Sequence, residues 1–65
     1  MKSLSKLPKI CGRTGLSRSS IYELIKNGMF PKPVKIGQVA VAWDDAEVDA
    51  WIASRVAQRD AQAGV

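Results

Sequence analysis

The stretch from residue 14 to residue 28 constrains the fold of this 65-residue chain most strongly. The pair Thr14-Gly15 predicts a tight turn, and Ser17 is a typical N-cap, because its hydroxyl oxygen can accept a backbone N–H of the first helical turn. Gly28 suits the left-handed position just past a helix end. Between these signals, the apolar side chains recur at i, i+3 and i+4: Ile21, Leu24 and Ile25. The sequence therefore predicts a turn and an amphipathic helix over residues 18–27.

The opposite face of this helix is polar and basic. It carries Arg18, Ser19, Tyr22 and Lys26. Arg18 could donate two parallel hydrogen bonds to a guanine or bind one phosphate. Ser17, Ser19 and Ser20 could bond base edges or phosphates at a helix start, where free N–H groups also favour an anion. These residues are candidates for major-groove contact. The alternatives are that Arg18 is only a surface charge, Tyr22 a core side chain and Ser20 a plain helix-start residue.

Further segments are predicted on both sides of this unit. Residues 1–5 form a lead-in that Leu4 could anchor, and a helix begins near Leu7, since Pro8 is tolerated in a first turn. Two prolines make residues 29–33 an extended connector. Residues 34–43 alternate at period two and predict a hairpin, with four side chains pointing inward: Val34, Ile36, Val41 and Trp43.

A last helix begins after Asp44, whose side chain fits an N-cap position. Its predicted buried stripe consists of Val48, Trp51, Ile52 and Val56. The predicted fold is mainly α with a small β-hairpin: a winged helix-turn-helix domain with a two-stranded wing and a C-terminal helix. We expect a single DNA-binding domain over residues 1–65, with an ordered core at about 4–57 and a frayed end at 58–65.

Composition excludes several classes of protein. The chain has no histidine and one cysteine, so it can build neither an internal disulfide nor a histidine–cysteine metal cluster. Cys11 fits an apolar stripe as a small core residue, and the acids near residue 45 suit capping better than catalysis or metal binding. We expect no enzyme activity, no metal, no cofactor and no small-molecule ligand. No segment predicts a signal peptide or a membrane span, so the expected location is the cytoplasm, at the nucleoid.

Charge is divided unevenly along the chain. Residues 1–35 hold eight basic side chains and one acid, whereas residues 36–65 hold two basic side chains and five acids. This asymmetry favours a polyanion as partner, although lysines also serve solubility. Lys35 suits a phosphate contact, and Gln38 at the uncharged hairpin tip could bond a phosphate or a base or remain an exposed turn residue. The two tryptophans are expected in the core, because the acids beside them would repel a stacked nucleic acid.

Three segments resemble the AlpA family of small phage and prophage regulators: residues 15–22, 28–37 and 43–52. The resemblance covers about residues 4–57. It implies a MerR-like and excisionase-like winged helix-turn-helix fold, with the recognition helix at residues 17–22 and the wing around Gly37. It further implies regulation of prophage genes, and some family members promote integrase-dependent excision. Where family wings usually carry an arginine, this chain has Gln38 and Val39, which implies a weaker contact at the wing tip.

The expected function is therefore sequence-specific binding of double-stranded DNA by a transcriptional regulator of prophage or integrated-element genes. In this hypothesis, residues 18–27 enter the major groove. One alternative is an excisionase that bends DNA for an integrase, and another is a protein-interaction module that does not bind DNA. Besides DNA, the partners to be considered are integrase, RNA polymerase and further copies of the chain on adjacent sites.

Overall fold

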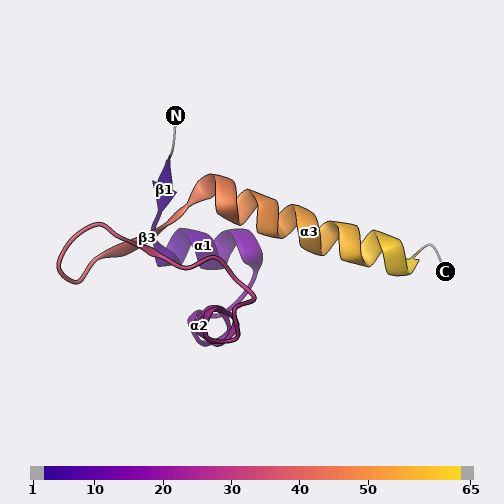
Figure 1. The fold of residues 1–65 in the computed structure, drawn as a ribbon, viewed down its shortest axis with the longest axis horizontal. Helices are drawn as coiled ribbons and strands as arrows, with labels where there is room; N and C mark the ends of the chain where they lie inside the picture. The colour runs from indigo at the N-terminus through magenta and orange to yellow at the C-terminus, as the bar shows by residue number, and fades with distance from the viewer. Residues whose placement is uncertain (1–2, 64–65) are drawn as a thin grey trace.

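The computed structural model describes residues 3–63. Within this range the chain forms helices and short strands in the order β1–α1–α2–β2–β3–α3 (Figure 1). Their bounds are β1 Leu4–Ser5, α1 Leu7–Thr14, α2 Arg18–Lys26, β2 Val34–Lys35, β3 Val41–Asp44 and α3 Asp45–Ala63. The predicted fold class, mainly helical with a β-hairpin between the second and third helices, is confirmed.

The turn between α1 and α2 follows the predicted local signals. Gly15 ends α1 with φ of 73° and donates its N–H to the carbonyl of Cys11 over 2.8 Å. Ser17 is the N-cap of α2, and its Oγ accepts the N–H of Ser20 over 3.2 Å. At the other end Gly28 takes a left-handed φ of 73°. The helix predicted at residues 18–27 is thus confirmed to within one residue.

The sheet contains a strand that the sequence analysis did not predict. β1 pairs antiparallel with β3, and β2 pairs with the other edge of β3, which gives the order β1-β3-β2. Ser5 lies opposite Trp43 and is buried, whereas Leu4 is 45% exposed. The prediction that Leu4 anchors the lead-in was wrong: its neighbour Ser5 faces the interior. Residues 1 and 2 of that lead-in lie outside the described part.

The buried core cluster takes one side chain from each helix, from β3 and from the connector between α2 and β2: Ile10, Ile21, Phe30, Trp43 and Val48. Three residues predicted to join them do not. Val34 and Ile36 are 42% and 46% exposed, because the hairpin extends past the helices that could cover it (Figure 1). Val56 is 42% exposed, because the C-terminal half of α3 likewise projects beyond the other elements.

Both tryptophans tie the connector between α2 and β2 to the body of the protein. The indole N–H of Trp43 donates to the Pro31 carbonyl over 3.0 Å, and that of Trp51 donates to the Met29 carbonyl over 2.7 Å. Between these carbonyls, Phe30 inserts into the core and meets the Trp51 ring edge-on at 4.8 Å between ring centroids. These contacts fix the position of α2 relative to the hairpin. The predicted core role is confirmed for Trp43, while Trp51 is half-buried.

The acids at the start of α3 have two separate roles. Asp44 accepts the N–H of Ala46 over 2.9 Å, as predicted for a cap. Asp45 and Asp49 instead bind Arg13 of α1. The Ser5 hydroxyl donates to Asp45 over 2.6 Å and is the main cause of a lowered pKa of that carboxyl, with Ser3 adding a second bond. The N-terminal strand, α1 and α3 are thus joined at one carboxylate.

Candidate nucleic-acid interface

The first turn of α2 is exposed to solvent and carries several hydrogen-bond donors. Ser17 and Ser20 are bonded to one another, since the Ser17 hydroxyl donates to Ser20 Oγ over 3.0 Å while it accepts the Ser20 N–H. The N–H of Ile21 reaches the Ser17 carbonyl over 3.0 Å. Within residues 3–63 this leaves the backbone N–H groups of Arg18 and Ser19 without an acceptor. The turn therefore presents two free N–H groups, one guanidinium and the Ser19 hydroxyl to solvent.

Tyr22 lies one turn further along α2, at the border between core and surface. Its ring meets the buried Trp43 edge-on at 6.3 Å between ring centroids, yet the residue is 39% exposed. The alternative of a core tyrosine therefore does not describe this side chain. Lys26 is exposed at the end of the same helix. No ion pair within residues 3–63 includes Arg18 or Lys26, so both cations are available to an external anion.

The hairpin beside α2 presents more apolar surface than charge. Its loop is closed by the N–H of Ile36, which donates to the Ala40 carbonyl over 3.0 Å. Lys35 and Gln38 are both exposed, as the sequence analysis expected. Val39 at the tip is 96% exposed. The structure thus places Lys35 in β2 and Gln38 at the loop, and within residues 3–63 no side-chain hydrogen bond or ion pair joins either residue to the first turn of α2.

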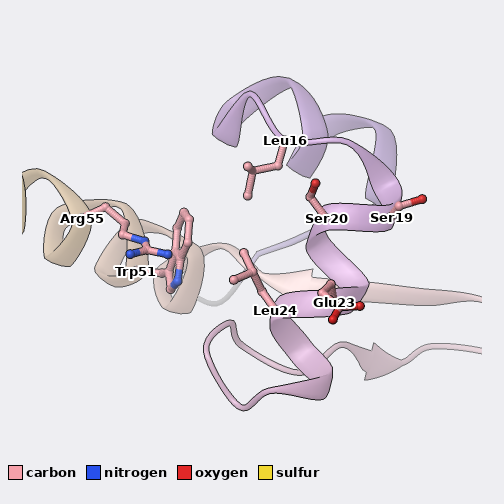
Figure 2. Close-up of a pocket in the computed structure, with 7 residues that line it drawn as sticks. All are labelled: Leu16, Ser19, Ser20, Glu23, Leu24, Trp51 and Arg55. Atoms are coloured by element: carbon pink, nitrogen blue, oxygen red, sulfur yellow. The ribbon is translucent and has the colours of Figure 1, made fainter.

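A groove of about 590 Å³ separates α2 from α3 (Figure 2). Its lining residues are Leu16, Ser19, Ser20, Glu23, Leu24, Trp51 and Arg55. Arg55 lies over the Trp51 ring, 5.1 Å from the guanidinium carbon to the ring centroid, and donates to Gln58 Oε1 over 3.2 Å. The sequence analysis missed this groove. The i, i+4 spacing of Trp51 and Arg55 was the available signal, but it did not indicate what the pair would face.

Charged side chains of α3 line two separate pockets. Asp45 and Asp49 gather around Arg13, next to Lys9 and away from α2. Arg55 faces the groove beside α2. The acids at the start of α3 are thus not among the residues that line the groove beside the first turn of α2.

The described residues were compared with the requirements of a membrane-spanning helix and of a metal site. Between residues 3 and 63 no helix is long and apolar enough to cross a membrane. In the same range no group of three or more histidine, cysteine or acidic side chains is arranged to hold a metal ion.

Comparison with known proteins yields one family and two relatives. Residues 4–56 match the family described as "Prophage CP4-57 regulatory protein (AlpA)". "Uncharacterized protein ORF88" of Enterobacteria phage P4 is 50% identical over 54 residues, which cover 83% of this chain and 61% of that protein. "DNA-binding transcriptional activator AlpA" of Escherichia coli K12 is 32% identical over 56 residues, which cover 77% of this chain and 80% of that protein. The chain thus spans less than two thirds of the phage P4 protein.

Proposed function

The chain belongs to the AlpA family, and we propose that it is a regulator that binds specific sites on double-stranded DNA through α2. The observation that carries this proposal is the first turn of α2. Ser17 caps this turn by accepting the Ser20 N–H. Arg18 and Ser19 keep free hydrogen-bond donors that face solvent. A relative at 32% identity bears the name of a DNA-binding transcriptional activator.

In the proposed complex α2 enters the major groove with its N-terminal turn first. Arg18 bonds a guanine edge, and Ser19 and Tyr22 contact bases or phosphates next to it. Ser17 and Ser20 hold the turn in shape and add hydroxyl oxygens at its rim. Lys26 lies at the far end of the helix, where it suits a phosphate.

The hairpin serves as a wing beside the recognition helix. Lys35 would bind a phosphate from β2, and Gln38 would bond a phosphate or base from the loop. Because the tip carries no cation, we expect the wing to add less affinity than α2 does.

We further propose that the regulated genes belong to a prophage or another integrated element, with RNA polymerase as the machinery that is recruited or blocked. This role would place the protein in the cytoplasm, at the nucleoid, and it includes no catalytic step. A single module of this size buries only about 600–1,000 Å² on DNA. Useful affinity would therefore come from repeated sites or from copies that associate on adjacent sites.

The proposal is tested by selecting sites for the purified protein from random duplex DNA and measuring affinities for the selected sequence. Arg18→Ala should weaken binding by about 1–3 kcal/mol and relax the preference at one base pair. Lys9→Ala is the matched control, since Lys9 is an exposed cation beside Asp45 and Asp49 rather than beside α2. If Arg18→Ala and Tyr22→Ala both bind like the parent protein, α2 is not the recognition helix.

Mapping the bound sites on the host chromosome then separates two roles. Sites that overlap promoters support the transcriptional role. Clustered sites beside an attachment site, together with bending of the bound DNA, would instead assign the chain to excision with an integrase.

A further inference from the structure

We propose that the groove between α2 and α3 holds the sugar–phosphate backbone of one DNA strand, with Arg55 as a phosphate ligand. This inference rests on the proposed function, because it concerns the same DNA that α2 would read. It extends the interface from the helix-turn-helix unit and the wing to the last helix.

The two sides of α2 indicate where the groove would lie relative to bound DNA. A helix that lies in the major groove has a phosphate backbone on each side. On one flank Tyr22 leans on Trp43 of β3, which is a strand of the wing. On the other flank Ser20 and Leu24 face Trp51 and Arg55 of α3 across the groove (Figure 2). One backbone would therefore run toward the wing, and the other would run along the groove.

The chemistry of the groove matches a sugar–phosphate chain. Arg55 has five N–H donors, and its only hydrogen bond within residues 3–63 uses one nitrogen to reach Gln58. Stacking on Trp51 holds the guanidinium in place without neutralising it. On the α2 side of the groove Ser20 Oγ accepts the Ser17 hydroxyl, and its own O–H has no acceptor in the described part of the chain (Figure 2). Between these polar groups Leu16, Leu24 and Trp51 offer apolar surface to the carbons of deoxyribose.

Arg55 also differs from the other arginines that lie outside α2. Arg13 is bound to Asp45 and Asp49, and Arg59 is bound to Asp60 over 2.7 Å. No ion pair within residues 3–63 includes Arg55, so its charge is available to a phosphate. Glu23 also lines the groove, and repulsion by its carboxylate would confine the phosphate to the side that Ser20 and Arg55 share (Figure 2).

The test is the salt dependence of affinity for the selected DNA site, measured from about 0.05 to about 0.3 M salt. Loss of one phosphate contact lowers the slope of log affinity against log salt by about 0.9, which corresponds to roughly fivefold weaker binding at about 0.15 M salt. Arg55→Gln should show this loss equally on selected and unrelated sequences. Arg55→Lys should keep most of the slope, because it keeps the charge. Lys9→Gln, which removes a cation next to Asp45 and Asp49, should leave the slope unchanged.

Thermal unfolding followed by circular dichroism shows whether each variant is folded at the assay temperature. A second readout needs no variant: DNA should reduce acrylamide quenching of the half-buried Trp51, whereas Trp43 is buried already. Parental salt slopes in Arg55→Gln would overturn the inference. So would an effect of Arg55→Gln confined to cooperativity between two sites, which would make the groove a contact between proteins. In both cases the proposed function would still hold if Arg18→Ala weakens DNA binding. If the parent protein selects no DNA sequence at all, both the proposed function and this inference are wrong.

Discussion

Replacement of each tryptophan by phenylalanine should separate the two indole bonds that hold the connector. Trp43 has no exposed surface, and its N–H donates to the Pro31 carbonyl over 3.0 Å. Trp51 is half-buried, and its N–H donates to the Met29 carbonyl over 2.7 Å, at a residue that is 56% exposed. The same chemical change is thus made once inside the core and once at the surface.

The expected loss in free energy of unfolding depends on whether water can replace the lost hydrogen bond at each site. Trp43→Phe removes two buried ring carbons, worth about 0.8 kcal/mol each. It also removes a hydrogen bond and leaves the Pro31 carbonyl without a donor, at a cost of about 1–3 kcal/mol. The total is about 3–4 kcal/mol. At Trp51 water can replace the lost N–H and part of the ring is already exposed, so the loss should be about 1 kcal/mol.

These differences are large for a domain of this size. At about 0.05–0.15 kcal/mol per residue, a chain of 65 residues has a free energy of unfolding of about 3–10 kcal/mol. Urea unfolding followed by far-ultraviolet circular dichroism measures both variants without relying on tryptophan emission. Equal losses at the two positions, or a smaller loss at Trp43, would refute the claim that the bond from Trp43 to Pro31 holds the connector more strongly than the bond from Trp51 to Met29 does.

Three further predictions test the helix ends and the carboxylate of Asp45. Ser17→Ala should lower the free energy of unfolding by about 0.5–2 kcal/mol, because the Ser20 N–H loses its acceptor; an unchanged urea midpoint would contradict the cap. Gly28→Ala should cost about 1–2 kcal/mol at its φ of 73°, whereas Gly12→Ala in the middle of α1 should be neutral or stabilising in the same assay. The lowered pKa of Asp45 means that its ionised form stabilises the fold above the ordinary value of 3.8 and that this contribution is lost as the pH falls through the lowered pKa. Below about pH 4, the melting temperature of Asp45→Asn should therefore depend less on pH than that of the parent protein. Parallel plots of melting temperature against pH would contradict the bonds from Ser3 and Ser5.

The helix ends were predictable from sequence because their signals are local. Ser17 needs only the N–H three residues ahead, and Gly28 needs only its own φ. Pro8 similarly sits within a first turn that lacks N–H partners in any case. Each of these features is determined within one or two turns of chain, so a single sequence was sufficient.

The strand β1 was not predictable in the same way. It consists of Leu4 and Ser5, and it pairs with residues about forty positions away. A two-residue strand has no periodicity, and a serine in it gives no sign of burial. The pairing is decided by the edge that β3 offers, together with the hydroxyl of Ser5 bonded to Asp45. Neither partner is visible from the local sequence.

The outward orientation of Val34 and Ile36 shows a different limit. Period-two alternation assigned these residues to one face of a strand, but it could not indicate whether a helix covers that face. The hairpin projects beyond α1, α2 and α3, so the face stays open. Candidate site residues were easier to identify in α2, because its apolar stripe fixes which side chains point outward. Arg55 was missed because its position in the groove beside α2 depends on how two helices pack.

The position of β3 between two very short strands has a consequence for how the protein behaves at high concentration. Each outer edge of the sheet offers only two residues, Leu4 and Ser5 on one side and Val34 and Lys35 on the other. Long unpaired edges are templates for strand addition and aggregation, and short edges that carry a lysine resist it. The protein can therefore expose Val39 at the hairpin tip without also offering a long β-edge to which another chain could add.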